Sequence, residues 1–100
     1  MNPYELITPT EMALQVAKRI QTLRLQNNWT QATLAERAGV SLGSYRRFEQ
    51  TGEIAFASLL LVACALGRMG DFHELFQPPL ARTLAELERQ QKPIRQRGRR

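Results

Sequence analysis

The sequence contains few of the residues that build catalytic, metal or disulfide sites. It has a single cysteine, Cys64, and a single histidine, His73. One cysteine cannot form an internal disulfide, and no second cysteine or histidine is available to complete a metal site with Cys64. Because an active site needs several titratable side chains that converge, we expect no enzyme activity, no metal and no cofactor. We interpret Cys64 as a buried core thiol and His73 as an ordinary helix residue.

Long apolar segments and strand patterns are missing as well. The longest apolar run, residues 59–66, ends at Gly67 and is much shorter than the roughly 18 residues of a membrane span. The first ten residues lack a basic segment followed by an apolar one, so we expect no secretory signal. No segment alternates between apolar and polar residues with hairpin turns at its ends. We therefore expect an all-α protein that acts in the cytoplasm, without a membrane partner.

Positive charge is concentrated at the C-terminal end. The chain carries a net charge of +5 over 100 residues, with 14 Lys and Arg against 9 Asp and Glu. Eight of the basic residues and all nine acids lie in residues 1–88, which gives −1, and the other six basic residues lie in 89–100, which gives +6. A nearly neutral body with a basic tail favours a polyanionic partner, most often nucleic acid. The tail residues expected to contact phosphate are Lys92, Arg95, Arg97, Arg99 and Arg100; a solubilising tail and docking to a partner protein are the alternatives.

Capping signals divide the first half of the chain into three helices. The first helix begins after Thr8, where Pro9 and Glu11 complete a capping box with proline at the first helical position. It runs to the asparagines at 27–28, with apolar residues on one face and Arg24 outside that face. Two short helices follow, with Thr30 and Ser41 as their N-caps and a glycine at the end of each.

The second half predicts three further helices. Residues 56–66 are apolar nearly all round, so we expect this helix at the centre of the core. A short fifth helix is expected after Asp71, with Phe72, Leu75 and Phe76 as its apolar side. A sixth is expected over 83–91, and we expect the chain beyond Pro93 to be disordered when free.

Two features of residues 29–52 indicate a binding function. The turn Gly39-Val40-Ser41 is the three-residue corner that a helix-turn-helix needs, with glycine first. Tyr45 and Phe48, three residues apart, are expected to point inward, so the geometry of the helix turns the residues between them outward. The small and basic outer face could admit DNA closely and reach guanine edges or phosphates, although a solvated helix face is the alternative. Thr30 and Gln31 open the preceding helix, whose free N–H groups favour phosphate.

These residues resemble the Cro/cI-repressor, or Xre, family of helix-turn-helix proteins over about residues 16–66. The resemblance rests on Trp29-Thr30-Gln31, Leu34-Ala35, Ala38-Gly39-Val40-Ser41, Tyr45, Phe48-Glu49, Gly52, and Leu59-Leu60 to Ala65-Leu66-Gly67. It implies that the helix after the turn lies in the major groove and that dimers read two half-sites. The implied DNA-binding residues are Gln31, Ser41, Leu42, Gly43, Ser44, Arg46, Arg47 and Gln50, whereas Glu49 is implied to be a structural acid. Leu42 and Gly43 depart from the family, which often has polar residues there, and the link before Gly52 is one residue longer than usual.

A finer resemblance is to HipB-like antitoxins, carried by residues 46–54, 59–60 and 71–76 and by the arginine-rich end. It implies self-repression of an operon and a HipA-family kinase toxin as partner. The aromatic residue that ends the tail in that group has no counterpart here.

The expected fold is all-α: a five-helix Cro/cI-repressor-like helix-turn-helix domain over 1–78, a short C-terminal helix within 79–91 and a basic tail over 92–100. Three functions stay open. They are a dimeric repressor that doubles as an antitoxin, a stand-alone or phage-derived regulator, and a protein-interaction adaptor that does not bind DNA.

Overall fold

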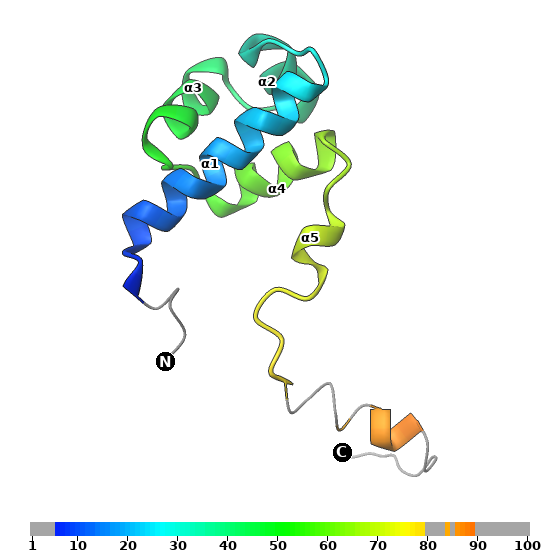
Figure 1. The fold of residues 1–100 in the computed structure, drawn as a ribbon. Coiled ribbons are helices and arrows are strands. Elements are labelled where there is room, and N and C mark those ends of the chain that lie inside the picture. The colour runs from blue at the N-terminus through cyan, green and yellow to red at the C-terminus, as the bar shows by residue number, and fades with distance from the viewer. Residues whose placement is uncertain (1–5, 80–83, 85, 90–100) are drawn as a thin grey trace. The chain divides into compact units, whose positions relative to one another are not determined.

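The computed structural model describes residues 6–79, 84 and 86–89. Contacts divide the chain into two compact units, Met1–Gly70 and Asp71–Arg100, which are described separately. The first unit holds four helices: α1 at Pro9–Gln26, α2 at Gln31–Ala38, α3 at Leu42–Thr51 and α4 at Phe56–Ala65 (Figure 1). The described residues are helical or irregular and contain no strand, so the predicted all-α class is confirmed.

The predicted caps define the ends of these helices. The Thr8 hydroxyl accepts from the Glu11 N–H at 3.1 Å, and the Glu11 carboxylate accepts from the Thr8 N–H at 2.9 Å. The N-caps of α2 and α3 likewise accept from the N–H three residues ahead, at 3.0 and 3.1 Å. Only the start of α4 lacks a side-chain cap among these four, as the alanine at position 55 predicts.

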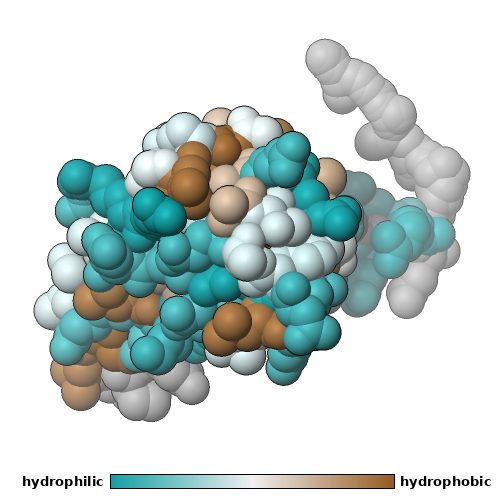
Figure 2. All heavy atoms as spheres, turned by 90° about the horizontal axis from the view of Figure 1, so that it is seen from above, coloured by the Kyte–Doolittle hydropathy of each residue, from teal (hydrophilic) through white to brown (hydrophobic). Residues whose placement is uncertain are grey.

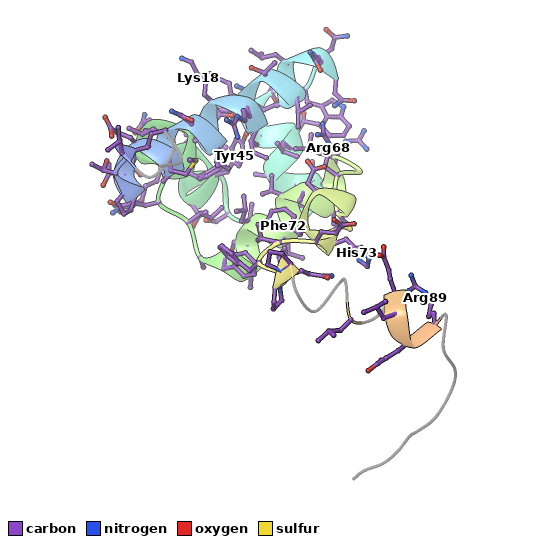
Figure 3. The ribbon with its side chains drawn as sticks, turned by 60° about the horizontal axis from the view of Figure 1, so that its bottom comes forward. Lys18, Tyr45, Arg68, Phe72, His73 and Arg89 are labelled. Carbon is purple, nitrogen blue, oxygen red and sulfur yellow. The ribbon has the colours of Figure 1, made fainter. Side chains whose placement is uncertain are left out.

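The core of the first unit lies where α1, α2, α3 and α4 meet. α1 packs against α3, and α2 packs against both α3 and α4. Tyr45 and Phe48 are fully buried, as predicted, with ring centroids 6.1 Å apart, and Figure 3 shows Tyr45 among the helices of this unit. The buried apolar residues are Ala17, Ile20, Leu34, Ala35, Ala38, Tyr45, Phe48, Val62 and Ala63.

Gly52 allows the end of α3 to approach α1 closely. Its φ is +81°, and an added Cβ would lie 2.8 Å from both the carbonyl carbon and the Cβ of Ala13. Glycine is therefore needed here both for the left-handed backbone and for the lack of a side chain.

Two predictions about burial are wrong. Cys64 is exposed, not a core thiol. It lies on α4, which buries only Val62 and Ala63 fully and leaves Leu61 47% exposed, because the other helices cover one side of it. Arg24, which the apolar pattern of α1 leaves outside the core, is instead 7% exposed.

The second unit differs in part from its prediction. Helix α5, Gly70–His73, begins one residue before Asp71, so Asp71 lies inside the helix and is not its cap. Phe76 lies beyond this four-residue helix, with φ of +62° and 92% of its surface exposed, and is not part of an apolar helix face. Residue 84 and residues 86–89 are helical, within the predicted sixth helix. The predicted disorder of the basic tail lies outside the described residues, and the boundary after residue 78 stays a prediction.

Single membrane-spanning helices and clusters of metal-ligating side chains are both absent from the described residues. No single helix has the length and apolar composition to cross a membrane; α3 and α4 would pass that test as a pair, but they are bent by 99° at the break between them. No group of three metal-ligating side chains comes together within residues 6–79, 84 and 86–89.

Candidate nucleic-acid interface

The corner between α2 and α3 is fixed by backbone hydrogen bonds. Gly39 adopts the left-handed conformation, with φ of +77°, and its N–H donates to the Ala35 carbonyl at 2.9 Å. The Val40 N–H donates to the same carbonyl at 3.0 Å, and the Val40 side chain packs against the core. The corner therefore holds α3 at a set angle to α2.

This corner turns one side of α3 outward. Five of the predicted DNA-binding residues on or beside it are exposed to solvent: Gly43, Ser44, Arg46, Arg47 and Gln50. Ser41, also exposed, caps the helix through its hydroxyl. The molecular face over α2 and α3 is mostly hydrophilic, with apolar residues in small separate patches (Figure 2).

Leu42 and Gln31 are less accessible than the other predicted site residues. The Leu42 side chain is partly buried and packs against the core, so only part of it could meet a thymine methyl group. Gln31 is half-buried, and its Nε2 donates to Glu49 Oε1 at 2.8 Å. A phosphate contact from the Gln31 amide would use its second N–H.

A buried polar network supports α3 from behind. Arg24 of α1 donates through Nε to Glu49 Oε2 at 2.8 Å and through Nη2 to Glu49 Oε1 at 3.2 Å. Its Nη1 donates to the Trp29 carbonyl at 2.8 Å. The Tyr45 hydroxyl also donates to Glu49. The network thus joins α1, the start of α2 and the middle of α3, and it makes Glu49 a structural acid.

The electrostatics of the network favour the ionised form of Glu49. Burial by itself would raise the pKa of the Glu49 carboxyl, but hydrogen bonds from Arg24, Tyr45 and Gln31 together bring that pKa below its ordinary value. The hydrogen bond to Glu49 raises the pKa of Arg24. Burial, followed by the hydrogen bond to Glu49, raises the pKa of Tyr45, so its hydroxyl stays a donor. All three groups therefore keep complementary states at neutral pH.

Two partners of this site, Arg24 and Glu53, are not predicted by the sequence patterns described above. The inward position of Arg24, although not its partner, could have been found from its spacing, because Ala17, Ile20 and Arg24 are three, four and seven residues apart and share one helix face. Glu53 was the other omission. Arg47 donates through Nη2 to Glu53 Oε1, just beyond the end of α3, whereas Arg46 makes no ion pair within the described part of the chain. The tail residues predicted to contact phosphate lie outside the described residues.

The comparisons with known proteins agree with this geometry. Residues 20–68 match the family model described as helix-turn-helix, of Cro/C1 type. The match supports the predicted resemblance to Xre-type helix-turn-helix proteins, and with it a DNA-binding domain of the kind found in transcriptional regulators. A search of curated proteins finds no match to the chain.

Proposed function

We propose that the chain is a transcriptional repressor that binds a specific sequence of double-stranded DNA as a homodimer. The observation that carries the proposal is the exposed face of α3, which presents small residues at its capped start and two arginines one turn further on. A buried network fixes the same helix from behind. A surface held rigidly on a helix is what readout in the major groove requires.

Each residue of the interface then has a role. Gly43 and Ser44 allow the start of α3 to approach the base pairs closely, because neither carries a large side chain. Arg46 and Arg47 reach guanine edges or phosphates. Ser41 and Gln50 border this set, and Gln31 meets a phosphate from the start of α2. The basic tail adds contacts to the DNA backbone and strengthens the salt dependence of binding.

We propose a homodimer because a domain this small reads too few base pairs on its own to bind selectively. Two copies reading half-sites one helical turn apart, about 34 Å, gain selectivity that one copy lacks. We assign the dimer contact to the fifth helix and to the stripe Leu80, Leu84 and Leu87, of which Leu84 and Leu87 are 50% and 44% exposed in the second unit. Analytical ultracentrifugation tests this assignment: Leu84→Asp with Leu87→Asp should convert the dimer to a monomer.

The finer part of the proposal is that the repressor is the antitoxin of a HipA-type operon and acts at the nucleoid in the cytoplasm. It rests on the resemblance over residues 46–54 and 71–76. A stand-alone or phage-derived regulator is the second candidate. A kinase-like gene next to this one, whose product co-purifies with the chain, supports the antitoxin, and its absence supports the second candidate.

The test of DNA binding is a titration against the duplex upstream of the chain's own gene, with a scrambled duplex beside it, at two salt concentrations. We expect selective binding, and Arg46→Ala should reduce affinity for the upstream duplex by about 1–3 kcal/mol. Lys18→Ala on α1 removes the same charge from an exposed residue outside the interface and serves as the control. Equal, weak binding of both duplexes would indicate that only the basic tail contacts DNA. Absence of any salt-dependent binding would favour the protein-interaction adaptor.

A further inference from the structure

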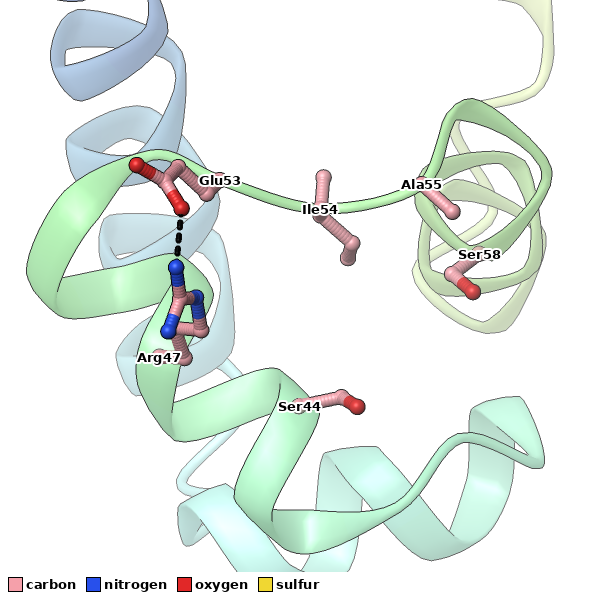
Figure 4. A pocket seen from close by; sticks show the side chains of 6 residues that line it. All are labelled: Ser44, Arg47, Glu53, Ile54, Ala55 and Ser58. Carbon is pink, nitrogen blue, oxygen red and sulfur yellow. Dashed lines mark hydrogen bonds and ion pairs between the residues drawn. The ribbon is translucent and has the colours of Figure 1, made fainter.

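The ion pair between Arg47 and Glu53 lies at the edge of the α3 surface. The two side chains are 65% and 64% exposed. They border a pocket of about 300 Å³ that lies between α3, the link from α3 to α4, and the start of α4 (Figure 4). Its lining residues are Ser44, Arg47, Glu53, Ile54, Ala55 and Ser58. The Arg47 guanidinium points toward Glu53, just beyond the C-terminal end of α3, and lies at the edge of this pocket (Figure 4).

The backbone around this pair is held by one hydroxyl group. Thr51 Oγ1 donates to the Arg47 carbonyl at 2.7 Å and accepts from the Glu53 N–H at 3.1 Å. Gly52, which lies between Thr51 and Glu53 and has a left-handed backbone conformation, turns the chain so that Glu53 comes back alongside α3. The relative position of the arginine and the glutamate is thus set by the end of the helix and does not depend on the two long side chains alone.

The ion pair with Glu53 gives Arg47 a different electrostatic environment from that of its neighbour Arg46. Arg46 carries an uncompensated charge within the described residues, whereas the charge of Arg47 is balanced by Glu53. Arginine has five N–H donors in a planar fork. Only one of them is used by Glu53, so the others stay available for a guanine edge, which offers two acceptors in fixed positions. A phosphate needs no such orientation, and the nearby carboxylate repels it.

We propose that Glu53 is a positioning residue for DNA recognition, which orients Arg47 toward a guanine edge and weakens its attraction for phosphates. The inference rests on the proposed function and adds a residue to it. Glu53 would then raise selectivity although, as an acid beside DNA, it lowers overall affinity. If Glu53 had only a structural role, its loss would instead lower the affinity for both duplexes.

The test compares four proteins on the preferred and the scrambled duplex: wild type, Glu53→Gln, Arg47→Ala and the double variant. We expect Glu53→Gln to raise affinity for the scrambled duplex by about two- to fivefold, the range of exposed ion pairs. The ratio of preferred to scrambled affinity should fall. In the Arg47→Ala background, Glu53→Gln should leave that ratio unchanged. Glu36→Gln, which removes an exposed acid without an ion pair among the described residues, is the charge control and should also leave it unchanged.

The outcomes separate this inference from the proposed function. If the wild type discriminates between the duplexes, but Glu53→Gln keeps the ratio or lowers it equally without Arg47, then Glu53 acts only as a nearby negative charge and the inference is overturned. If the wild type binds both duplexes equally, the proposed function fails, and the role of Glu53 fails with it. Thermal unfolding of each variant verifies that the ratio is measured on folded protein.

Discussion

Arg24 and Glu49 form an ion pair that is almost closed to solvent, with side chains 9% and 4% exposed and a nitrogen–oxygen distance of 2.8 Å. The pair connects α1 to α3 across the core. A buried pair of this kind contributes little net stability when intact, but removing one partner leaves an uncompensated buried charge. Helix α3, to which we assign the DNA contact, is therefore coupled to the stability of the whole first unit.

Neutralising Glu49 should destabilise the fold strongly. Glu49→Gln leaves the guanidinium of Arg24 buried without its counter-ion, so we expect the free energy of unfolding to fall by about 3–5 kcal/mol. Urea denaturation measures this loss. Glu36→Gln, an exposed change on α2, should stay within about 0.5 kcal/mol of the wild type. Equal stability of the two variants would mean that the pair is not buried in solution.

The same pair should make stability depend on pH in the acid range. Because the hydrogen bonds of Glu49 lower its pKa in the folded state below the ordinary value of 4.5, the unfolded chain binds this proton more readily. The stabilisation is complete above pH 4.5 and is lost as pH falls through the lower, folded-state pKa. Unfolding experiments from pH 7 to pH 3 should show stability falling with acid in the wild type, with a smaller slope in Glu49→Gln. Identical slopes would show that Glu49 does not titrate with folding.

Gly52 should be less replaceable than Gly39, although both have positive φ. At Gly39 an added Cβ meets nothing within 4 Å, so Gly39→Ala should cost only the left-handed strain, about 1–2 kcal/mol. At Gly52 the same atom would lie 2.8 Å from the backbone of Ala13. Gly52→Ala should therefore lower the melting temperature further than Gly39→Ala. A larger fall in melting temperature for Gly39→Ala than for Gly52→Ala would mean that α1 lies farther from the end of α3.

Gly43 offers a way to separate folding from binding. It lies inside α3, and an added Cβ meets nothing within 4 Å. Gly43→Ala should therefore raise the free energy of unfolding by about 0.5–1 kcal/mol, because glycine is unfavourable within a helix. The same methyl group lies on the face that we assign to DNA and should weaken binding to the preferred duplex. A variant that is more stable and binds with unchanged affinity would remove Gly43 from the interface.

Local signals predicted much of the fold. The caps at Thr8, Thr30 and Ser41 each depend on atoms within three residues, so sequence spacing alone shows them. The inward pair of Tyr45 and Phe48 follows from helical periodicity in the same way. These features were sufficient to locate the corner and the outward face of α3.

Two features were harder to predict: which buried polar residues pair with each other, and which side of a uniformly apolar helix is exposed. Arg24 and Glu49 are 25 residues apart, and their pairing depends on how α1 and α3 pack, which no local pattern contains. The exposure of Cys64 has a similar cause. An apolar helix such as α4 has no polar side to mark its outer face, so only the placement of its neighbours decides which residues are covered.

The most direct test of the account is to map the DNA contact on the protein by the amide chemical shifts of the 11.4 kDa chain, with and without the upstream duplex. We predict the largest changes at residues 41–50 and at Gln31, and little change on the outer side of α1. A scrambled duplex at the same concentration should change these shifts little. Changes confined to the C-terminal basic residues, with α3 unaffected, would contradict the claim that α3 reads DNA.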